Sequence, residues 1–289
     1  MSSPQNPPEL TTIERLVAAL KPLPPVAHVL ARLQRLLVDT NSGMDDIADL
    51  IRLDPALATR VIRISNSVWF KRGLPCATIE EAVNRVGFRE VYRVVAVVAS
   101  NAMVAEPLVA YGRDALMMWR ESIACAFAAE ILAERLGEEM SVAYMSGLLH
   151  TIGRLPINQY VLSLSDPCKP LAEESFPREH SGAEYALLGF SQAEVGAFML
   201  AKWDFTPATI RPIQHQYEPL EAEEPHDRMS AVLYGARLLR TAVCQDLPFD
   251  ELSIDEEILG TLRLSSDDLL SHLPELRDQL TRAQQLTKV

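Results

Sequence analysis

Helix-start signals recur along this 289-residue chain, and they constrain its fold more than any other feature. Residues 78–81 (Thr-Ile-Glu-Glu) and 191–194 (Ser-Gln-Ala-Glu) have the capping-box pattern, in which a hydroxyl and a carboxylate satisfy backbone N–H groups at a helix start. Residues 11–14 (Thr-Thr-Ile-Glu) repeat this pattern, and Ser42 marks another start. Residues 54–55 place an aspartate cap before a proline, which suits the first helical turn. These signals predict a succession of short helices.

Between these signals, apolar residues return every three or four positions, as they do on one face of a helix. No stretch has the alternation of a half-buried strand, and the frequent Leu, Ala, Arg and Glu residues favour helices. Hydrophobic residues make up 48% and charged residues 23%, which is an ordinary globular balance. The expected fold class is all-α, with helices at residues 11–20, 26–38, 42–53, 56–65, 79–86, 88–104, 119–136, 142–160, 191–203, 206–217 and 228–243, and shorter ones beginning at 253, 265 and 273.

The net charge of −12 is distributed unevenly. Residues 1–120 carry 14 Lys and Arg against 12 Asp and Glu, whereas residues 121–289 carry 13 against 27. An acidic chain is repelled by a phosphate backbone, so nucleic-acid binding is not expected. Any anionic small ligand is expected on the more basic N-terminal half.

The cysteines give no sign of a disulfide framework or a zinc site, because Cys76, Cys125, Cys168 and Cys244 are far apart and form no Cys-x-x-Cys pair. The polar N-terminal residues lack the apolar core of a signal peptide. The apolar run at residues 94–99 is too short to cross a bilayer. We therefore expect a cytoplasmic location and no membrane contact.

One histidine lies inside a strongly apolar segment, residues 144–155 (Tyr-Met-Ser-Gly-Leu-Leu-His-Thr-Ile-Gly-Arg-Leu). Met145, Leu148 and Ile152 recur at helical spacing around His150, so the segment is predicted to be a buried helix. A histidine in such a run is either a satisfied core residue or part of a site. Gly147 is expected to permit close helix packing.

The segment is one of a set of short pieces that occur in a characteristic order. They are residues 23–24 (Leu-Pro), 54–57 (Asp-Pro-Ala-Leu), 66–67 (Asn-Ser), 78–82 (Thr-Ile-Glu-Glu-Ala), 86–87 (Val-Gly), 119–122 (Trp-Arg-Glu-Ser), 147–153, 188–197 and Trp203. In this order the pieces resemble the HDOD domain, the HD-related output domain of bacterial signalling proteins. The resemblance extends over residues 22–217 and implies an N-terminal helical subdomain (about 22–110) packed on an HD-like helical subdomain (about 111–217). Residues 1–21 then form a tail and helix, and residues 218–289 form a helical extension that completes or caps the HD-like part.

The related HD enzymes bind catalytic metals through histidines and aspartates, and this chain keeps few of them. By the resemblance, the His-Asp pair corresponds to His150 and Thr151, an early histidine to Glu121, and a later His-His pair to His215 and Gln216. The last aspartate is expected between residues 233 and 239, where the chain has none. Losing these carboxylates removes the charge that favours a divalent ion over water, so we predict no catalytic residues, no metal and no other cofactor. The alternative is a weak metal-dependent phosphohydrolase that uses Glu121, His150 and His215 as ligands.

A second group of candidate binding residues is basic. Arg85, Arg89 and Arg93 follow one another at a spacing of four, and Arg154 follows the His-Thr pair. One interpretation is a site for an anion, such as a nucleotide-type second messenger or an acidic partner surface, because guanidinium groups suit phosphate and carboxylate. The interpretation that we favour is a basic face paired with Glu80, Glu81 and Glu90 or docked on the acidic C-terminal half.

These observations favour a non-catalytic signalling or regulatory module that acts by binding. The resemblance implies bacterial signal transduction, as a response-regulator type of output, and a protein partner in such a pathway. Because the chain shows no recognisable receiver or cyclic-dinucleotide domain, two arrangements are compatible with it: a chain that acts alone, and a chain that is part of a longer protein.

Overall fold

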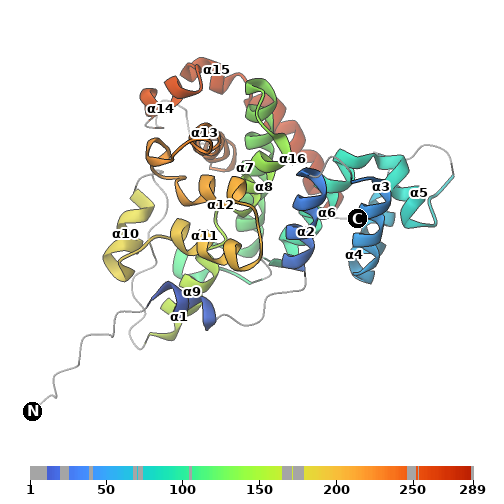
Figure 1. Ribbon diagram of the computed structural model, residues 1–289, viewed down its shortest axis with the longest axis horizontal. Coiled ribbons are helices and arrows are strands. Elements are labelled where there is room, and N and C mark those ends of the chain that lie inside the picture. The colour runs from blue at the N-terminus through green and yellow to red at the C-terminus, as the bar shows by residue number, and fades with distance from the viewer. Residues whose placement is uncertain are drawn as a thin grey trace, which may run out of the picture.

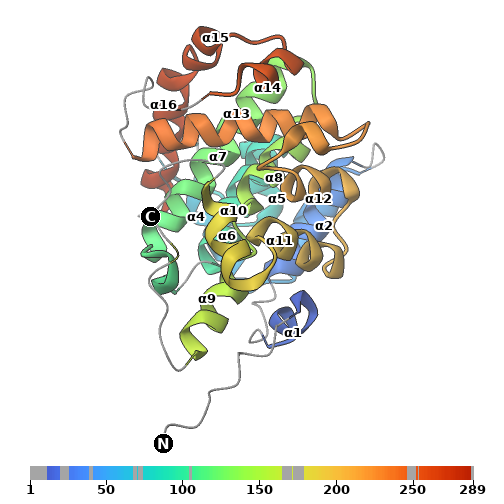
Figure 2. The ribbon, with the colours of Figure 1, turned by 90° about the vertical axis from the view of Figure 1, so that its left-hand side faces the viewer.

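The computed structural model describes residues 12–19, 26–38, 42–67, 70, 74–103, 106–164, 171, 179–245, 252 and 254–287. Within these residues the regular structure is helical, apart from one isolated bridge between Leu108 and Arg113, so the all-α prediction is confirmed. In the same residues, no helix combines the length and the apolar character needed to cross a membrane. The helices form two groups, which lie side by side in Figure 1 and one behind the other in Figure 2.

The first group follows the N-terminal part of the sequence. It consists of α2 (Val26–Val38), α3 (Met44–Arg52), α4 (Pro55–Ser65), α5 (Ile79–Val86) and α6 (Phe88–Met103). Helix α6 packs against α2 and α4, and α5 packs against α3 and α4. The loop between α4 and α5 is fastened by Asn66, whose side-chain amide accepts from the backbone N–H of Cys76 and donates to its carbonyl, at 2.7 and 2.8 Å.

The second group is built around one long helix. Helix α7 (Ala115–Leu136) packs along α8 (Met140–Leu149) on one side and α13 (Asp227–Cys244) on the other, and its residues 121–133 are all buried. The other helices of this second group are α1 (Ile13–Ala18), α9 (Arg154–Ser163), α10 (Glu179–Leu188), α11 (Gln192–Lys202), α12 (Pro207–Gln214), α14 (Glu256–Thr261), α15 (Ser266–Leu270) and α16 (Leu273–Thr287). The group also has two short 3₁₀ turns, η1 (Val109–Tyr111) and η2 (Pro219–Glu221). Helix α1 contacts α9 and α11, and α16 packs on α7 and α13.

Most predicted helix starts agree with the structure. Thr78 and Ser191 each cap their helix with a complete capping box, and the Asp54 side chain accepts from the backbone N–H of Leu57 at 3.1 Å. Two predicted caps are wrong. The first helix is capped by Thr12, while Thr11 lies outside the described residues. The third is capped by Gly43 rather than Ser42, and the Gly43 N–H donates to Asp46 at 2.8 Å.

The single helix predicted over residues 142–160 is wrong, because the structure has two. Helix α8 ends at Leu149, residues 150–153 turn, and α9 begins at Arg154. Helix α10 is a further element that the periodicity did not indicate, and α7 begins four residues before its predicted start.

Two glycines allow the backbones around this turn to approach closely. A Cβ at Gly147 would lie 2.5 Å from the carbonyl oxygen of Cys125 on α7, so the expectation of close packing at Gly147 is confirmed. A Cβ at Gly153 would overlap the carbonyl oxygen of Gln192 at the start of α11. Helix α8 therefore lies directly on the backbone of α7, and the turn after it lies directly on the backbone of α11.

We expect Gly153→Ala to destabilise the fold by about 1–3 kcal/mol, because the added methyl group must push apart two backbones. The matched control is Gly182→Ala in α10, where a Cβ meets nothing within 4 Å. That change is expected to be neutral or stabilising by up to about 1 kcal/mol, since alanine favours helix over glycine. Urea unfolding followed by circular dichroism measures both, and equal midpoints for the two variants would contradict the packing argument.

Candidate functional site

His150 lies at the end of α8, and only 1% of its surface is exposed. Its Nδ1 is 2.7 Å from the carbonyl oxygen of Gly147. Because a carbonyl can only accept, Nδ1 carries the proton and Nε2 is left as an acceptor. Burial, followed by the charges of Arg240 and Arg237, lowers the pKa of His150 well below its ordinary value. The ring is therefore neutral at neutral pH.

The acceptor nitrogen of His150 faces Arg240, a buried residue of α13. Nη1 of Arg240 lies 3.4 Å from Nε2 of His150, and the same atom lies 3.8 Å from Oε2 of Glu121 on α7. Nη2 donates a 3.0 Å hydrogen bond to Oγ1 of Thr241. A histidine nitrogen and a carboxylate, both ordinary metal-binding groups, thus converge on a cation that belongs to the protein.

Glu121 is enclosed between two arginines. It is 3% exposed, and Nε of Arg113, in the loop before α7, lies 3.8 Å from its Oε1. A buried carboxylate is costly unless it is paired, so the two guanidinium groups account for its presence in the interior.

The backbone carbonyl of His150 is also fully used. It accepts hydrogen bonds from the side-chain amides of Gln192, at 3.1 Å, and Gln216, at 2.8 Å. Gln192 also donates to the hydroxyl of Tyr217 at 2.8 Å, and Arg237 donates to the carbonyl of Gln216 at 2.6 Å. The turn after α8 is therefore held by the start of α11, the residues after α12, and α13.

The remaining residues near the His-Thr pair are buried as well. Thr151 is 5% exposed and Arg154 1%. The guanidinium carbon of Arg154 lies 5.2 Å from the ring centre of Tyr111, whose hydroxyl donates to Glu184 at 2.8 Å. Glu184 in turn accepts from the backbone N–H of Gln192 at 2.6 Å. Arg154 is thus part of the interior and is not presented to a ligand in solution.

His215 does not join this cluster. It follows α12 and is partly exposed, in a polar cavity that it lines together with Arg211, Glu221 and His226. Partial burial and the nearby charge of Arg211 lower its pKa. The alternative ligand set of Glu121, His150 and His215 is therefore not brought together.

The residues around His150 do not fit a divalent metal ion. Protein sites for zinc and similar ions use at least three protein ligands. Here two potential ligands meet a guanidinium, and Thr151 supplies a hydroxyl where the related enzymes have a carboxylate. Across the described part of the chain, no three His, Cys, Asp or Glu side chains are placed to share an ion.

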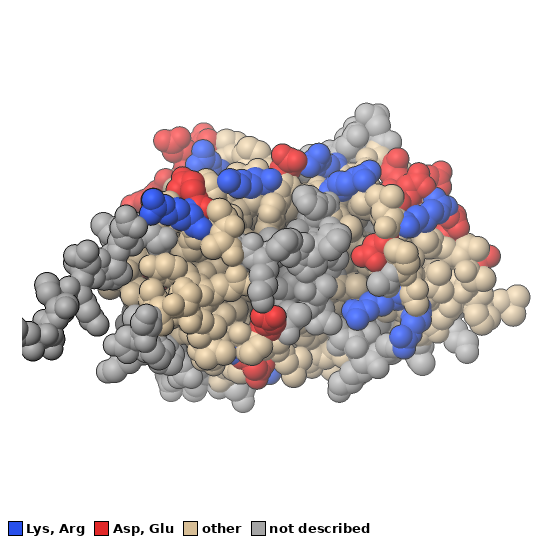
Figure 3. Space-filling view, turned by 90° about the horizontal axis from the view of Figure 1, so that it is seen from below, with Lys and Arg blue, Asp and Glu red and all other residues tan. Residues whose placement is uncertain are grey.

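The basic residues on α6 are occupied by carboxylates of the protein. Arg93 pairs with Glu130 on α7 at 2.7 Å and with Glu90 at 2.6 Å, and Arg89 pairs with Glu130 at 3.1 Å. Arg85 donates to the Asn66 side chain at 3.3 Å and to the carbonyl of Leu74. In Figure 3, Lys and Arg lie beside Asp and Glu, without one continuous basic patch among the described residues of that face.

Sequence reasoning missed the arginines that define this core. Arg240, Arg237 and Arg113 were not among the candidates, although the first two stand three residues apart in an otherwise apolar helix. Two buried arginines at that spacing are a signal of an internal partner, because arginine is almost never fully buried unless it is paired.

The buried neutral His150 makes stability depend on pH. Below about pH 6.5 the unfolded chain takes up a proton at His150, whereas the folded chain does not. The free energy of unfolding is therefore unaffected by this histidine above that pH, and it falls by up to about 1.4 kcal/mol per pH unit below it. We expect the loss of stability between pH 7.5 and pH 5.5 to be smaller in His150→Gln than in the unchanged protein. Urea midpoints at the two pH values measure this, and parallel losses would contradict it.

The ion pair between Arg240 and Glu121 is expected to show strong coupling. Arg240→Met should cost about 3 kcal/mol, because Glu121 remains buried and keeps only one of its two arginine partners, Arg113. Adding Glu121→Gln should restore part of that loss, since the buried charge is removed. A double-mutant cycle by chemical unfolding measures the coupling, and costs that simply add would show that the two residues do not interact.

Comparison with solved structures finds the same helical fold. A protein from Geobacter sulfurreducens, described as an HDOD domain protein with unknown function, superposes with a TM-score of 0.68 at 21% identity, over 94% of this chain and 96% of that one. A Shewanella amazonensis protein, provisionally named a phosphohydrolase, gives 0.65 at 24%, over 95% and 97%. A Marinobacter aquaeolei protein, provisionally named a signal transduction protein, gives 0.68 at 24%, over 95% of this chain and 61% of that one.

Comparison of sequences leads to the family. An uncharacterised protein of Treponema pallidum (strain Nichols) is 24% identical over 251 residues, which are 86% of this chain, and the chain spans about half (47%) of that relative's length. The family model of the HDOD domain matches residues 23–219, which is close to the range of the resemblance in the sequence. With a helical fold like that of solved HDOD proteins and a family match over most of its length, this chain belongs to the HDOD family.

Proposed function

We propose that this chain is a non-catalytic regulatory module of bacterial signal transduction, which acts by binding a protein partner. The observation that carries the proposal is the position of Arg240, whose Nη1 lies 3.4 Å from Nε2 of His150. Because Nδ1 is bonded to the Gly147 carbonyl, Nε2 is the ring nitrogen that could bind a metal ion. Here the guanidinium of Arg240, a permanent cation, lies in front of this nitrogen and also balances the charge of Glu121.

Electrostatics opposes a metal ion at this place. Metal-dependent hydrolysis requires an ion that lowers the pKa of a bound water. A divalent ion near His150 would lie within a few ångströms of the guanidinium of Arg240, and like charges at that distance repel strongly in a buried environment. Thr151 adds no negative charge to offset this repulsion.

The alternative function is a weak metal-dependent phosphohydrolase. It is favoured by the convergence of His150 and Glu121, which approach the same nitrogen of Arg240. If the arginine moved away, these two side chains would be left facing a common point. His215 would not contribute, so a third ligand would have to come from water or substrate.

A protein is a better partner for this chain than a nucleic acid. The net charge of −12 opposes a phosphate backbone, and the basic residues of α6 are already paired with Glu90 and Glu130. These charges support a protein partner, and membership of the HDOD family supports a role in signalling.

Metal content and hydrolysis test the proposal together. The protein would be expressed with manganese, iron and zinc supplied, purified without chelator, analysed by elemental mass spectrometry, and assayed with bis(p-nitrophenyl) phosphate. We expect substoichiometric metal and a hydrolysis rate that His150→Ala does not change, because Arg240 already occupies the metal-facing side of His150.

The matched control for that experiment is His226→Ala, which removes a histidine of the separate polar cavity. Loss of metal in both variants would indicate ordinary surface binding. Near-stoichiometric metal that is lost in His150→Ala and kept in His226→Ala, together with hydrolysis that disappears with it, would overturn the proposal and establish the phosphohydrolase.

A further inference from the structure

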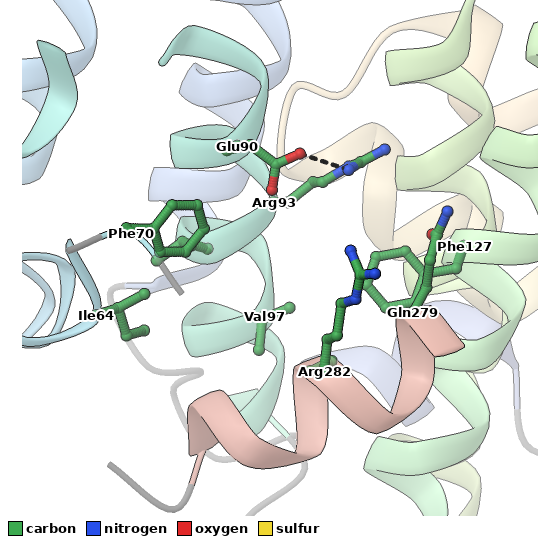
Figure 4. A pocket seen from close by; sticks show the side chains of 10 residues that line it. Ile64, Phe70, Glu90, Arg93, Val97, Phe127, Gln279 and Arg282 are labelled. Atoms are coloured by element: carbon green, nitrogen blue, oxygen red, sulfur yellow. Dashed lines mark hydrogen bonds and ion pairs between the residues drawn. The ribbon is translucent and has the colours of Figure 1, made fainter. Parts of the chain in front are cut away.

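A cavity of about 260 Å³ lies where the two helix groups meet, away from the His150 core. Its walls come from α4 and α6 on one side and from α7 and α16 on the other (Figure 4). This volume is slightly below the range of about 300–1,000 Å³ that is typical of pockets for drug-sized ligands. A small organic molecule would fill it.

One part of the cavity is apolar and partly aromatic. Ile64 of α4, Phe70, which follows α4, and Val97 of α6 line one side, and Phe127 of α7 lines the opposite side. Apolar walls with aromatic rings favour a flat apolar group, because ring contacts add to the gain from burying apolar area.

The other part of the cavity is polar. Arg93 and Glu90 form an ion pair there at 2.6 Å, and Arg93 is further fixed by the buried Glu130. Because these charged side chains satisfy one another, they hold this wall of the cavity in place. They are not readily available to pair with a ligand. Figure 4 shows Gln279 and Arg282 extending from α16 toward this pair.

Arg282 is the cation of this cavity that a ligand can recruit at least cost. It pairs with Asp278 at 2.6 Å, but both side chains are more than half exposed, and exposed pairs of this kind contribute little. Because its side chain is more than half exposed, the guanidinium remains accessible to the acid group of a ligand. Oε1 of Gln279 is buried and has no hydrogen-bond partner among the described residues, so it can accept a hydrogen bond from a ligand.

We propose that this cavity binds a small aromatic organic acid that also carries an N–H or O–H donor. The aromatic body packs between Phe70 and Phe127, the acid group pairs with Arg282, and the donor satisfies Oε1 of Gln279. Because the walls belong to both helix groups, such a ligand fixes their relative position. This binding site is separate from the His150 core, and ligand affinity is measured without any assay of metal content or hydrolysis. A failure here would therefore leave the proposed absence of metal catalysis untouched.

The probe for this site is anilinonaphthalene sulfonate, which combines an aromatic body, an anionic group and an N–H. Fluorescence titration of the full chain should show saturable binding of one probe per chain. Arg282→Gln should weaken it by about tenfold, as expected for a charge-assisted hydrogen bond. The matched control is Arg277→Gln, which makes the same change at an exposed position of α16 outside the cavity and should leave the affinity unchanged.

A second variant tests the location. Ala283 is buried and lines the cavity, so Ala283→Phe should fill the space and abolish saturable binding while the circular dichroism spectrum stays helical. If that variant does not fold, Val97→Ile, which reduces the space by one methylene, should still weaken the probe.

Competition then tests the ligand class. Indole-3-acetate should displace the probe, and the straight-chain decanoate should do so less well. Equal effects of Arg282→Gln and Arg277→Gln, unchanged affinity in the cavity-filling variants, or better displacement by decanoate would each overturn the proposal.

Discussion

The contact of Arg240 with His150 and Glu121 is the interaction on which the interior of this protein depends. It joins α13 to α7 and to the end of α8, the three helices that form the centre of the larger helix group. A charge in such an interior is tolerated only with a partner, so the arginine and the glutamate require each other. Nε2 of the neutral histidine faces the same guanidinium.

The turn at residues 150–153 gives this core its geometry. Had α8 continued into α9, the carbonyl of His150 would have bonded within the helix; instead it accepts from the amides of Gln192 and Gln216. The absence of a side chain at Gly153 lets α11 lie against the turn. The residues around His150 are therefore buried and closely packed.

The junction between the two helix groups is made of an ion-pair cluster and a hydrogen bond that lie apart from the Arg240 core. Glu130 of α7 is nearly buried and binds both Arg89 and Arg93 of α6, while Tyr92 donates to the carbonyl of Ser141 at 3.0 Å. Beside these fixed contacts the groups do not meet completely, and the space between them is the cavity bounded by α16. Fixed polar contacts next to an incompletely filled space are a favourable setting for a ligand that couples two parts of a molecule.

The sequence by itself determined the fold class, most helix starts and the position of the His-Thr pair, because capping and apolar periodicity act over a few residues. It also indicated that the related enzymes' carboxylates are missing, since that is a matter of residue identity. It did not determine that α8 ends at Leu149, because the apolar spacing continues across the turn. Hydrogen bonds from distant glutamines to the His150 carbonyl hold the chain in the turn. Nor did it reveal Arg240 beside His150, 90 positions away. Such contacts depend on how helices pack, and only the tertiary structure decides which buried charges meet.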